Sequence, residues 1–235
     1  MEPKRNILLY ILVPAWTKAP RADLQEVDTS VNEQPLPNNV ITHDLNNPDS
    51  DAIINQLGFN NADSSQSVQV IYVPCYLNGN DGIFDITYYD MLAGMDLTAF
   101  PSYYEPWGYT PLESVAFGVP TVTTSLSGFG QWVLASGNNG FDKSGVEVIT
   151  RNDSNYMEVA DRLSKCMFNL SNASADAMAS CSAAAREQRR KPSGTISSPI
   201  ISRRSASHWP RQTSAATSNH SDNSLYIRMD EMILS

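Results

Sequence analysis

The chain has 235 residues, of which 41% are hydrophobic and 17% are charged, so it is large and apolar enough to form a folded core. Its net charge is −9, and no Lys or Arg lies between Arg21 and Lys143. This acidic character excludes nucleic acid and anionic membrane surfaces as partners, because both require clustered cations. An anionic ligand of the middle region would have to be bound by backbone amides or by cations from elsewhere.

The cysteine and histidine content argues against a disulfide framework and against metal chemistry. The three cysteines have no CxxC spacing, which predicts reduced thiols in a cytoplasmic protein. With only three histidines, the sequence suggests neither a metal cluster nor a Ser-His-Asp arrangement, so we expect no metal and no cofactor. These residues are Cys75, Cys166 and Cys181, and His43, His208 and His220.

The first expected strand covers Asn6–Val13, an almost continuously apolar run typical of a strand buried on both faces. The basic start superficially resembles a signal peptide, but the apolar run is short, β-rich and ends at Pro14. It also falls short of the roughly 20 apolar residues that a membrane span needs. A polar loop with a short helix is expected over Pro20–Pro48, followed by a helix capped at Asp49–Asp51 and running to Leu57.

From residue 68 onward, expected strands and helices alternate, which predicts a parallel, Rossmann-like α/β sheet with ligands beyond the carboxyl ends of its strands. The last helix carries its apolar residues at helical spacing. The expected strands are Val68–Val73, Leu97–Phe100, Val119–Thr124 and Val146–Thr150. The expected helices are Thr87–Met95, one from Thr110 to Gly118, and one from Asp153 bearing Met157, Ala160, Leu163, Met167 and Leu170.

The segment Phe100–Gly130 holds two carboxylates whose spacing allows two interpretations. In the first, Thr110 and Glu113 form a capping box at the start of a helix, and Glu105 is a solvated loop residue. In the second, both carboxylates accept hydrogen bonds from sugar or ribose hydroxyls, while the free amides of that helix start bind a phosphate.

Aromatic residues crowd around the same segment. They predict either hydrophobic packing beneath the loop or a stacking platform for a base or a sugar ring. The turn Gly128–Gly130 is a weaker candidate for a ligand-approaching loop. The aromatic residues are Tyr88, Tyr89, Tyr103, Tyr104, Trp107 and Tyr109.

Three motifs carry a resemblance to a known family: Val73–Phe84 (VPCYLNGNDGIF), Pro101–Ser114 (PSYYEPWGYTPLES) and Gly118–Gly130 (GVPTVTTSLSGFG). Through them, residues 1–185 resemble the carboxy-terminal half of glycogen synthases of the animal and fungal type and their bacterial relatives. These enzymes are GT-B glycosyltransferases, with two Rossmann-like domains facing each other across a cleft. The resemblance implies transfer of glucose from UDP-glucose or ADP-glucose to the non-reducing 4-hydroxyl of an α-1,4-glucan, with retention of configuration and without a metal.

The resemblance also implies roles for individual residues. Glu105 is similar to a catalytic glutamate close to the donor glucose, and Glu113 to one that holds the ribose hydroxyls. The four residues Trp107, Gly108, Tyr109 and Thr110 match a loop that cradles the diphosphate. Tyr88 aligns with a tyrosine placed against the nucleobase. The implied partners are a nucleotide-glucose and glycogen or another α-glucan, with self-association as in full-length relatives and a cytoplasmic location.

The chain departs from the family pattern in two ways. The first is the absence of parts of the catalytic machinery, which lowers the expected activity. The family places an arginine and a lysine at the start of this domain to neutralise the leaving diphosphate, and this chain begins after that point. It also lacks the family's amino-terminal domain with the acceptor site. Because losing such charge stabilisation costs several kcal/mol of barrier, we expect the polypeptide alone not to turn over.

Residues 186–235 form the second departure, because they are rich in Ser, Arg, Thr and Pro and predict a disordered tail. Codons compatible with Glu187–Ile201 can be chosen whose neighbouring frame encodes a family-like Trp-Asp-x-Phe helix, so we hypothesise a frameshift near residue 186. The resulting domain division is 1–185 for a partial GT-B domain and 186–235 for the tail. The alternatives to a glycosyltransferase fragment are a non-catalytic nucleotide-sugar or glucan binding module and a truncated pseudogene product.

Overall fold

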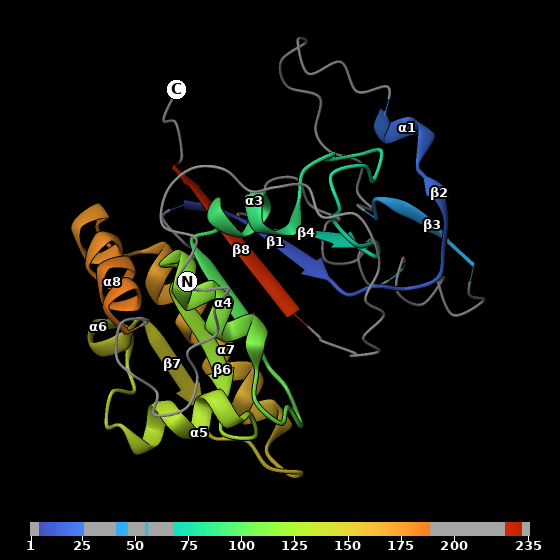
Figure 1. The fold of residues 1–235 in the computed structure, drawn as a ribbon. Helices are drawn as coiled ribbons and strands as arrows, with labels where there is room; N and C mark the ends of the chain where they lie inside the picture. The colour runs from blue at the N-terminus through green and yellow to red at the C-terminus, as the bar shows by residue number, and fades with distance from the viewer. Residues whose placement is uncertain (1–4, 26–40, 47–54, 56–67, 189–223, 232–235) are drawn as a thin grey trace.

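The protein is described by a computed structural model that covers residues 5–25, 41–46, 55, 68–188 and 224–231. A six-stranded sheet with the order β4-β1-β8-β5-β6-β7 runs through these residues (Figure 1). Its strands are β1 (Arg5–Leu12), β4 (Val68–Val73), β5 (Leu97–Phe100), β6 (Thr121–Thr124), β7 (Val146–Ile149) and β8 (Ser224–Glu231).

Strand pairing confirms the Rossmann-like prediction. Strand β1 pairs in parallel with β4, and β6 pairs in parallel with both β5 and β7. Parallel neighbours need crossover connections, and helices supply them between β5 and β6 (Tyr109–Phe117) and between β6 and β7 (Gly128–Ala135 and Phe141–Ser144). The strand segments Val68–Val73 and Leu97–Phe100 were predicted with the bounds that the structure gives them, because both are β-branched or apolar runs bounded by polar or turn residues.

Helices cover both faces of this sheet. The helices are α3 (Tyr88–Ala93), α4 (Tyr109–Phe117), α5 (Gly128–Ala135), α6 (Phe141–Ser144), α7 (Tyr156–Ser171) and α8 (Ala175–Gln188). Helix α7 packs its buried side chains against residues of β1, β5, β6 and β7 on one face. Helices α3, α4 and α5 lie on the other face (Figure 1), where Phe100 and Val148 contribute to their packing.

A small subdomain accompanies the main sheet. Strands β2 (Thr17–Pro20) and β3 (His43–Leu45) form a two-stranded antiparallel sheet, with helix α1 (Ala22–Gln25) between them. The prediction of a polar loop with a short helix in this part of the chain therefore missed the two short strands. The helix expected between residues 49 and 57 lies outside the described residues, apart from residue 55.

The structure corrects the predicted face of the long helix. Helix α7 begins at Tyr156, and its buried apolar residues are Val159, Leu163, Cys166 and Leu170. Leu163 and Leu170 were predicted correctly, but Met157 is 75% exposed. Met167 is half-buried and packs against the same cluster, whereas Val159 and Cys166, rather than Met157 and Ala160, complete the stripe that meets the sheet.

The tail contributes one strand to the centre of the sheet. Strand β8 pairs antiparallel with β1 along Arg5–Leu12 and with β5 along Leu97–Ala99. The expectation of disorder from residue 186 onward therefore does not hold for Ser224–Glu231, nor for the end of α8 at Gln188. The segments 189–223 and 232–235 lie outside the described residues. Among the described helices, none combines the length and apolar character that crossing a membrane demands.

Candidate functional site

The predicted site loop lies between β5 and α4, at the carboxyl edge of the parallel strands. Backbone hydrogen bonds hold it against the start of α5: the Glu105 amide donates to the Leu126 carbonyl at 3.2 Å, and the Gly128 amide donates to the Glu105 carbonyl at 3.1 Å. The Phe129 amide donates to the Trp107 carbonyl at 2.6 Å. The loop is therefore fixed by its main chain, which leaves its side chains available for binding.

Two glycines make this close approach sterically feasible. A Cβ atom on Gly128 would lie 2.4 Å from the Pro106 carbonyl oxygen, and one on Gly130 would lie 2.2 Å from the Thr124 carbonyl oxygen. Both glycines belong to the first turn of α5, whose N-cap Ser127 accepts a hydrogen bond from the Gly130 amide at 3.0 Å. The predicted ligand-approaching turn is thus a helix start, and its glycines serve backbone packing.

The start of α4 differs from the predicted capping box. Its N-cap is Gly108 in the left-handed conformation (φ 99°), and no side chain caps the helix. Thr110 is consequently the second helical residue, and Glu113 lies beyond the first turn. The capping-box interpretation is wrong, because Gly108 takes the cap position two residues earlier. The amide groups of the first turn remain uncapped by any side chain, as a helix-start anion site requires.

Glu105 lies beside this helix start. A Cβ atom on Gly108 would be 3.5 Å from Glu105 Cγ and 3.0 Å from Pro111 Cγ, so the stem of the glutamate side chain lies against the cap residue. Glu105 is partly exposed, and its backbone also forms a β-bridge with Ser127. The structure therefore brings Glu105, Gly108 and the first turn of α4 together.

Glu113 is held by a tyrosine from the neighbouring helix. The Tyr89 hydroxyl donates to Glu113 Oε1 at 3.0 Å, and the Tyr89 ring stacks on Phe117 with a centroid distance of 5.6 Å. Tyr88 packs edge-on against Tyr89 at 5.2 Å. The predicted site residues Tyr88 and Glu113 are thus linked through Tyr89, to which the sequence analysis assigned no role of its own.

The remaining aromatics divide between packing and exposure. Tyr103, Tyr104 and Tyr109 are 51%, 80% and 64% exposed, so they do not pack beneath the loop. Trp107 is partly buried, and its Nε1 is buried with no hydrogen-bond partner among the described residues. The other interpretation, a stacking platform for a base or a sugar ring, stays a prediction.

Arg151 is a site neighbour that sequence reasoning missed. It follows β7 and is 5% exposed, and its guanidinium carbon lies 3.4 Å from the ring centroid of Tyr103. Its Nη1 donates to the carbonyl oxygen of Pro101, at the start of the loop. The sequence did hold a sign of its importance. Arg151 directly follows the predicted strand Val146–Thr150, so it was expected to lie at the carboxyl edge of the sheet, where ligands bind.

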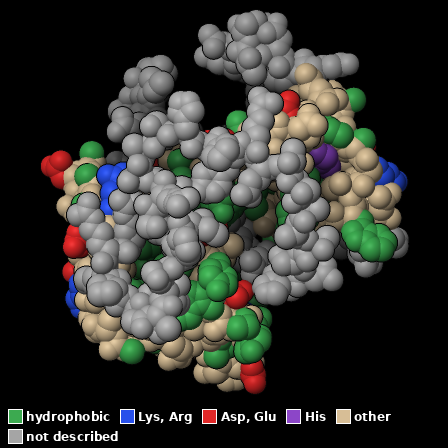
Figure 2. Space-filling view, viewed as in Figure 1, with side chains coloured by type: hydrophobic (Ala, Val, Ile, Leu, Met, Phe, Trp, Pro, Cys, Tyr) green, Lys and Arg blue, Asp and Glu red, His purple; other side chains and the backbone are tan. Residues whose placement is uncertain are grey.

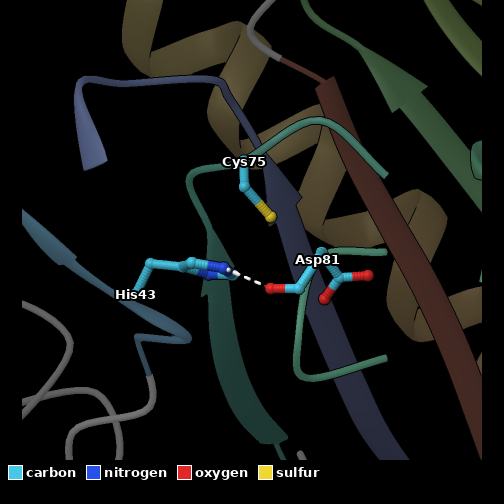
Figure 3. Close-up of side chains that lie close together, drawn as sticks. All are labelled: His43, Cys75 and Asp81. Atoms are coloured by element: carbon cyan, nitrogen blue, oxygen red, sulfur yellow. Dashed lines mark hydrogen bonds between the residues drawn. The ribbon is translucent and has the colours of Figure 1, made fainter. Parts of the chain in front are cut away.

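A second group of chemically active side chains lies where β3 of the small subdomain meets the turn that follows β4. Ligand atoms of His43, Cys75 and Asp81 lie within 4.8 Å of one another (Figure 3). His43 Nε2 lies 2.9 Å from the Asp81 carbonyl oxygen, so this nitrogen carries the proton, and Nδ1 lies 2.9 Å from Thr42 Oγ1. The imidazole is therefore engaged at both nitrogens.

The other two members of this group also interact with the surrounding protein. The Asp81 carboxylate accepts backbone hydrogen bonds from Ile83, Phe84 and Asp85 at 2.9–3.1 Å. Burial, reinforced by Asp81, raises the pKa of the Cys75 thiol to about 11, which keeps the free thiol neutral. We interpret the group as a structural lock between β3 and the turn that Asp81 organises.

The cysteines are free, as the sequence predicted. Burial raises the pKa of the Cys166 thiol to about 11, with the nearby Glu147 carboxylate adding to the effect, and burial raises the pKa of Cys181 as well. Neutral thiols are poor nucleophiles, so no cysteine here has the character of a catalytic residue.

Positive charge is scarce around the site. Figure 2 shows one face of the molecule, on which the visible Lys and Arg side chains lie near the outline. This distribution follows from the sequence, which has no Lys or Arg between Arg21 and Lys143. Backbone amides and the buried Arg151 are thus the electropositive groups that the described loop region offers to an anion.

Comparison with known proteins gives the site a context. Residues 17–183 match the glycogen synthase family. Glycogen [starch] synthase isoform 1 of Saccharomyces cerevisiae is 46% identical over 98 residues, which cover 40% of this chain and 14% of the yeast protein. The Neurospora crassa glycogen [starch] synthase is 34% identical over 139 residues, or 57% of this chain and 19% of that protein.

The human liver glycogen [starch] synthase is 43% identical over 105 residues, which cover 43% of this chain. Each of these alignments spans less than a fifth of the relative's own length, from 14% to 19%. The chain therefore corresponds to a limited part of the proteins it matches.

Proposed function

The chain belongs to the glycogen synthase family, and from this premise we propose that it provides the donor-binding side of a retaining glycosyltransferase. The reaction transfers glucose from a nucleotide-glucose to the non-reducing 4-hydroxyl of an α-1,4-glucan. The observation that carries the proposal is the placement of Glu105 over the uncapped, glycine-led start of α4. That arrangement combines a hydroxyl-binding carboxylate with an anion-binding helix terminus.

Each part of the site suits one part of a nucleotide-glucose. The amides of Tyr109 and Thr110 in the first turn of α4 suit the diphosphate, because they lie at the positive end of the helix dipole. Glu113, oriented by the Tyr89 hydroxyl, suits the ribose hydroxyls. Tyr88 is our candidate for contact with the base, Trp107 for the wall of the diphosphate loop, and Glu105 for the donor glucose, where its carboxylate faces the reacting carbon.

The proposal includes a metal-free reaction with UDP-glucose or ADP-glucose as donor, in the cytoplasm. Donor binding that persists unchanged in the presence of a chelator supports this, and loss of binding with EDTA contradicts it. Self-association, as in full-length relatives, stays a prediction that light scattering of the purified chain can check.

Titration of the full chain with UDP-glucose and ADP-glucose, followed by calorimetry, tests the proposal directly. We expect saturable binding of one of them. The substitution Glu113→Gln should weaken it by roughly 10- to 100-fold, because a hydrogen bond to a charged acceptor contributes about 1.5–3 kcal/mol. The matched control Glu158→Gln changes an acidic residue in the first turn of α7 and should leave the affinity unchanged. Absence of binding to both nucleotides would refute the proposal.

A non-catalytic nucleotide-sugar or glucan binding module is the second candidate function. The lack of any Lys or Arg between Arg21 and Lys143 favours it, since a leaving diphosphate is normally neutralised by cations. Incubation with radiolabelled nucleotide-glucose and glycogen distinguishes the two: incorporation of label into the glucan supports the enzyme, and binding without incorporation supports the module.

A further inference from the structure

The side chain of Arg151 connects the end of β7 to the loop that carries Glu105. Its backbone amide donates to Ser125 Oγ at 3.0 Å, and this hydroxyl lies just beyond β6. Because the Ser125 amide also donates to the Ile149 carbonyl at 2.9 Å, the backbone of Arg151 is anchored to two adjacent strands. The guanidinium thus extends from a rigid base.

The guanidinium contacts the loop in two ways. Nη1 donates to the Pro101 carbonyl oxygen, and the guanidinium carbon stacks 3.4 Å above the Tyr103 ring. A planar guanidinium can make both contacts at once, whereas a lysine ammonium lacks the flat face needed for stacking. Pro101 and Tyr103 lie four and two residues before Glu105, so these contacts fix the approach of the chain to the glutamate.

The electrostatic situation of Arg151 indicates that this contact is costly to maintain. The residue is 5% exposed, yet the described part of the chain contains no carboxylate in an ion pair with it. Its buried Nε also has no hydrogen-bond partner among the described residues. Burial of a charged group without full compensation is unfavourable, and an apolar side chain of similar size would pack there at lower cost.

We propose that Arg151 is a positioning residue, whose guanidinium holds Pro101 and Tyr103 so that Glu105 faces the sugar of the bound nucleotide-glucose. The inference rests on the proposed donor site. On this proposal, the unfavourable free energy of burying Arg151 is tolerated because the residue fixes the geometry of the loop, and not because it contacts the diphosphate.

Amide hydrogen exchange on the free protein tests the positioning role without any ligand. Arg151→Lys keeps the positive charge but removes the planar guanidinium that holds Pro101 and Tyr103. We therefore expect the Glu105 amide to exchange at least about 10-fold faster in this variant. Amides of α7 should keep their protection in Arg151→Lys. The control is Arg162→Lys, at an exposed residue paired with Glu147, and it should change the exchange of neither the Glu105 amide nor the α7 amides. Unchanged exchange at Glu105 in Arg151→Lys would overturn the proposal.

Binding measurements distinguish positioning from direct contact. For Arg151→Lys we expect about a 10-fold loss of affinity for the nucleotide-glucose, and less than about a twofold loss for the corresponding nucleoside diphosphate, since only the former contacts Glu105. Equal losses for both ligands would mean that Arg151 contacts the diphosphate, and the positioning role would be abandoned. If the unmodified chain binds neither ligand, the donor site itself fails, and the exchange experiment alone decides whether Arg151 positions the loop.

Discussion

At the scale of single residues, the site depends on side chains that orient other side chains. Tyr89 shows this most directly, because its ring packs on Phe117 while its hydroxyl donates to Glu113. The sequence resemblance gave a role to Tyr88 and none to Tyr89, and only the orientation of α3 in the structure assigns the hydrogen bond to Tyr89. Glu113 could therefore be predicted as a site residue, but its partner could not.

Replacement of Tyr89 by phenylalanine should separate orientation from packing. The ring stack on Phe117 survives, so the free energy of unfolding should change by less than about 1 kcal/mol, while loss of the hydrogen bond should weaken nucleotide-glucose binding by roughly 3- to 10-fold. Calorimetric titration and urea denaturation measure the two quantities. Tyr76→Phe, at a tyrosine that is 70% exposed, is the matched control. A Tyr89→Phe variant with unchanged affinity would remove Glu113 from the proposed site.

At the scale of elements, predictions succeeded where a strand was a clear apolar run and failed where backbone packing decided the conformation. The strands β4 and β5 were predicted with their observed bounds. The segment Gly128–Gly130 was not predicted as a helix start, because glycine is a poor helix former and signals a turn in a single sequence. The contact between two backbones at Gly130 is a tertiary constraint that the sequence does not reveal.

Substitution of that glycine should reveal the constraint. In Gly130→Ala the new Cβ would lie 2.2 Å from the Thr124 carbonyl oxygen, so the start of α5 must move, and we expect a loss of about 2–4 kcal/mol of stability. The amides of Gly128 and Phe129, which donate to the loop carbonyls of Glu105 and Trp107, should lose protection with it. Urea denaturation of the purified variant measures the loss.

Gly137→Ala is the matched control for this experiment. A Cβ at Gly137 has no atom within 4 Å, but the residue has a φ of +68°, so only conformational strain of about 1–2 kcal/mol is expected. A Gly130 variant that is no less stable than the Gly137 variant would contradict the steric explanation.

At the scale of the whole molecule, the alternating pattern predicted the parallel sheet, but not how its centre is completed. The order β4-β1-β8-β5-β6-β7 places β8 where a doubly wound sheet of order 3-2-1-4-5-6 has its first strand. Here the strand runs antiparallel to both neighbours and comes from Ser224–Glu231. Composition assigned this segment to a tail, because a short apolar run surrounded by polar sequence carries no sign of its distant partners.

Removal of β8 should therefore lower the free energy of unfolding more than removal of a typical tail would. Deletion of residues 224–235 leaves the facing edges of β1 and β5 unpaired, and we expect the free energy of unfolding to fall by at least about 3 kcal/mol or the cooperative transition to disappear. Deletion of residues 232–235 alone keeps the strand and should be neutral. Equal urea midpoints for the two deletions would show that β8 does not stabilise the sheet.

The uncapped start of α4 has a consequence for the kinetics of binding. The helix terminus offers a partial charge of roughly +0.5, which acts only at short range, whereas the chain as a whole carries a net charge of −9. A nucleotide diphosphate is thus repelled during its approach and attracted only on contact. Added salt shortens the Debye length from about 30 Å at 0.01 M to about 8 Å at 0.15 M, which weakens the repulsion more than the contact.

Association with the donor should consequently become faster as ionic strength rises, the reverse of the trend for nucleotide sites built from lysines and arginines. Stopped-flow measurement of the association rate constant over this salt range checks the expectation. A rate constant that falls with salt would mean that a cation outside the described residues guides the ligand. A helix that binds its ligand through main-chain amides thus lets a negatively charged protein accept an anionic substrate, and high ionic strength favours their association.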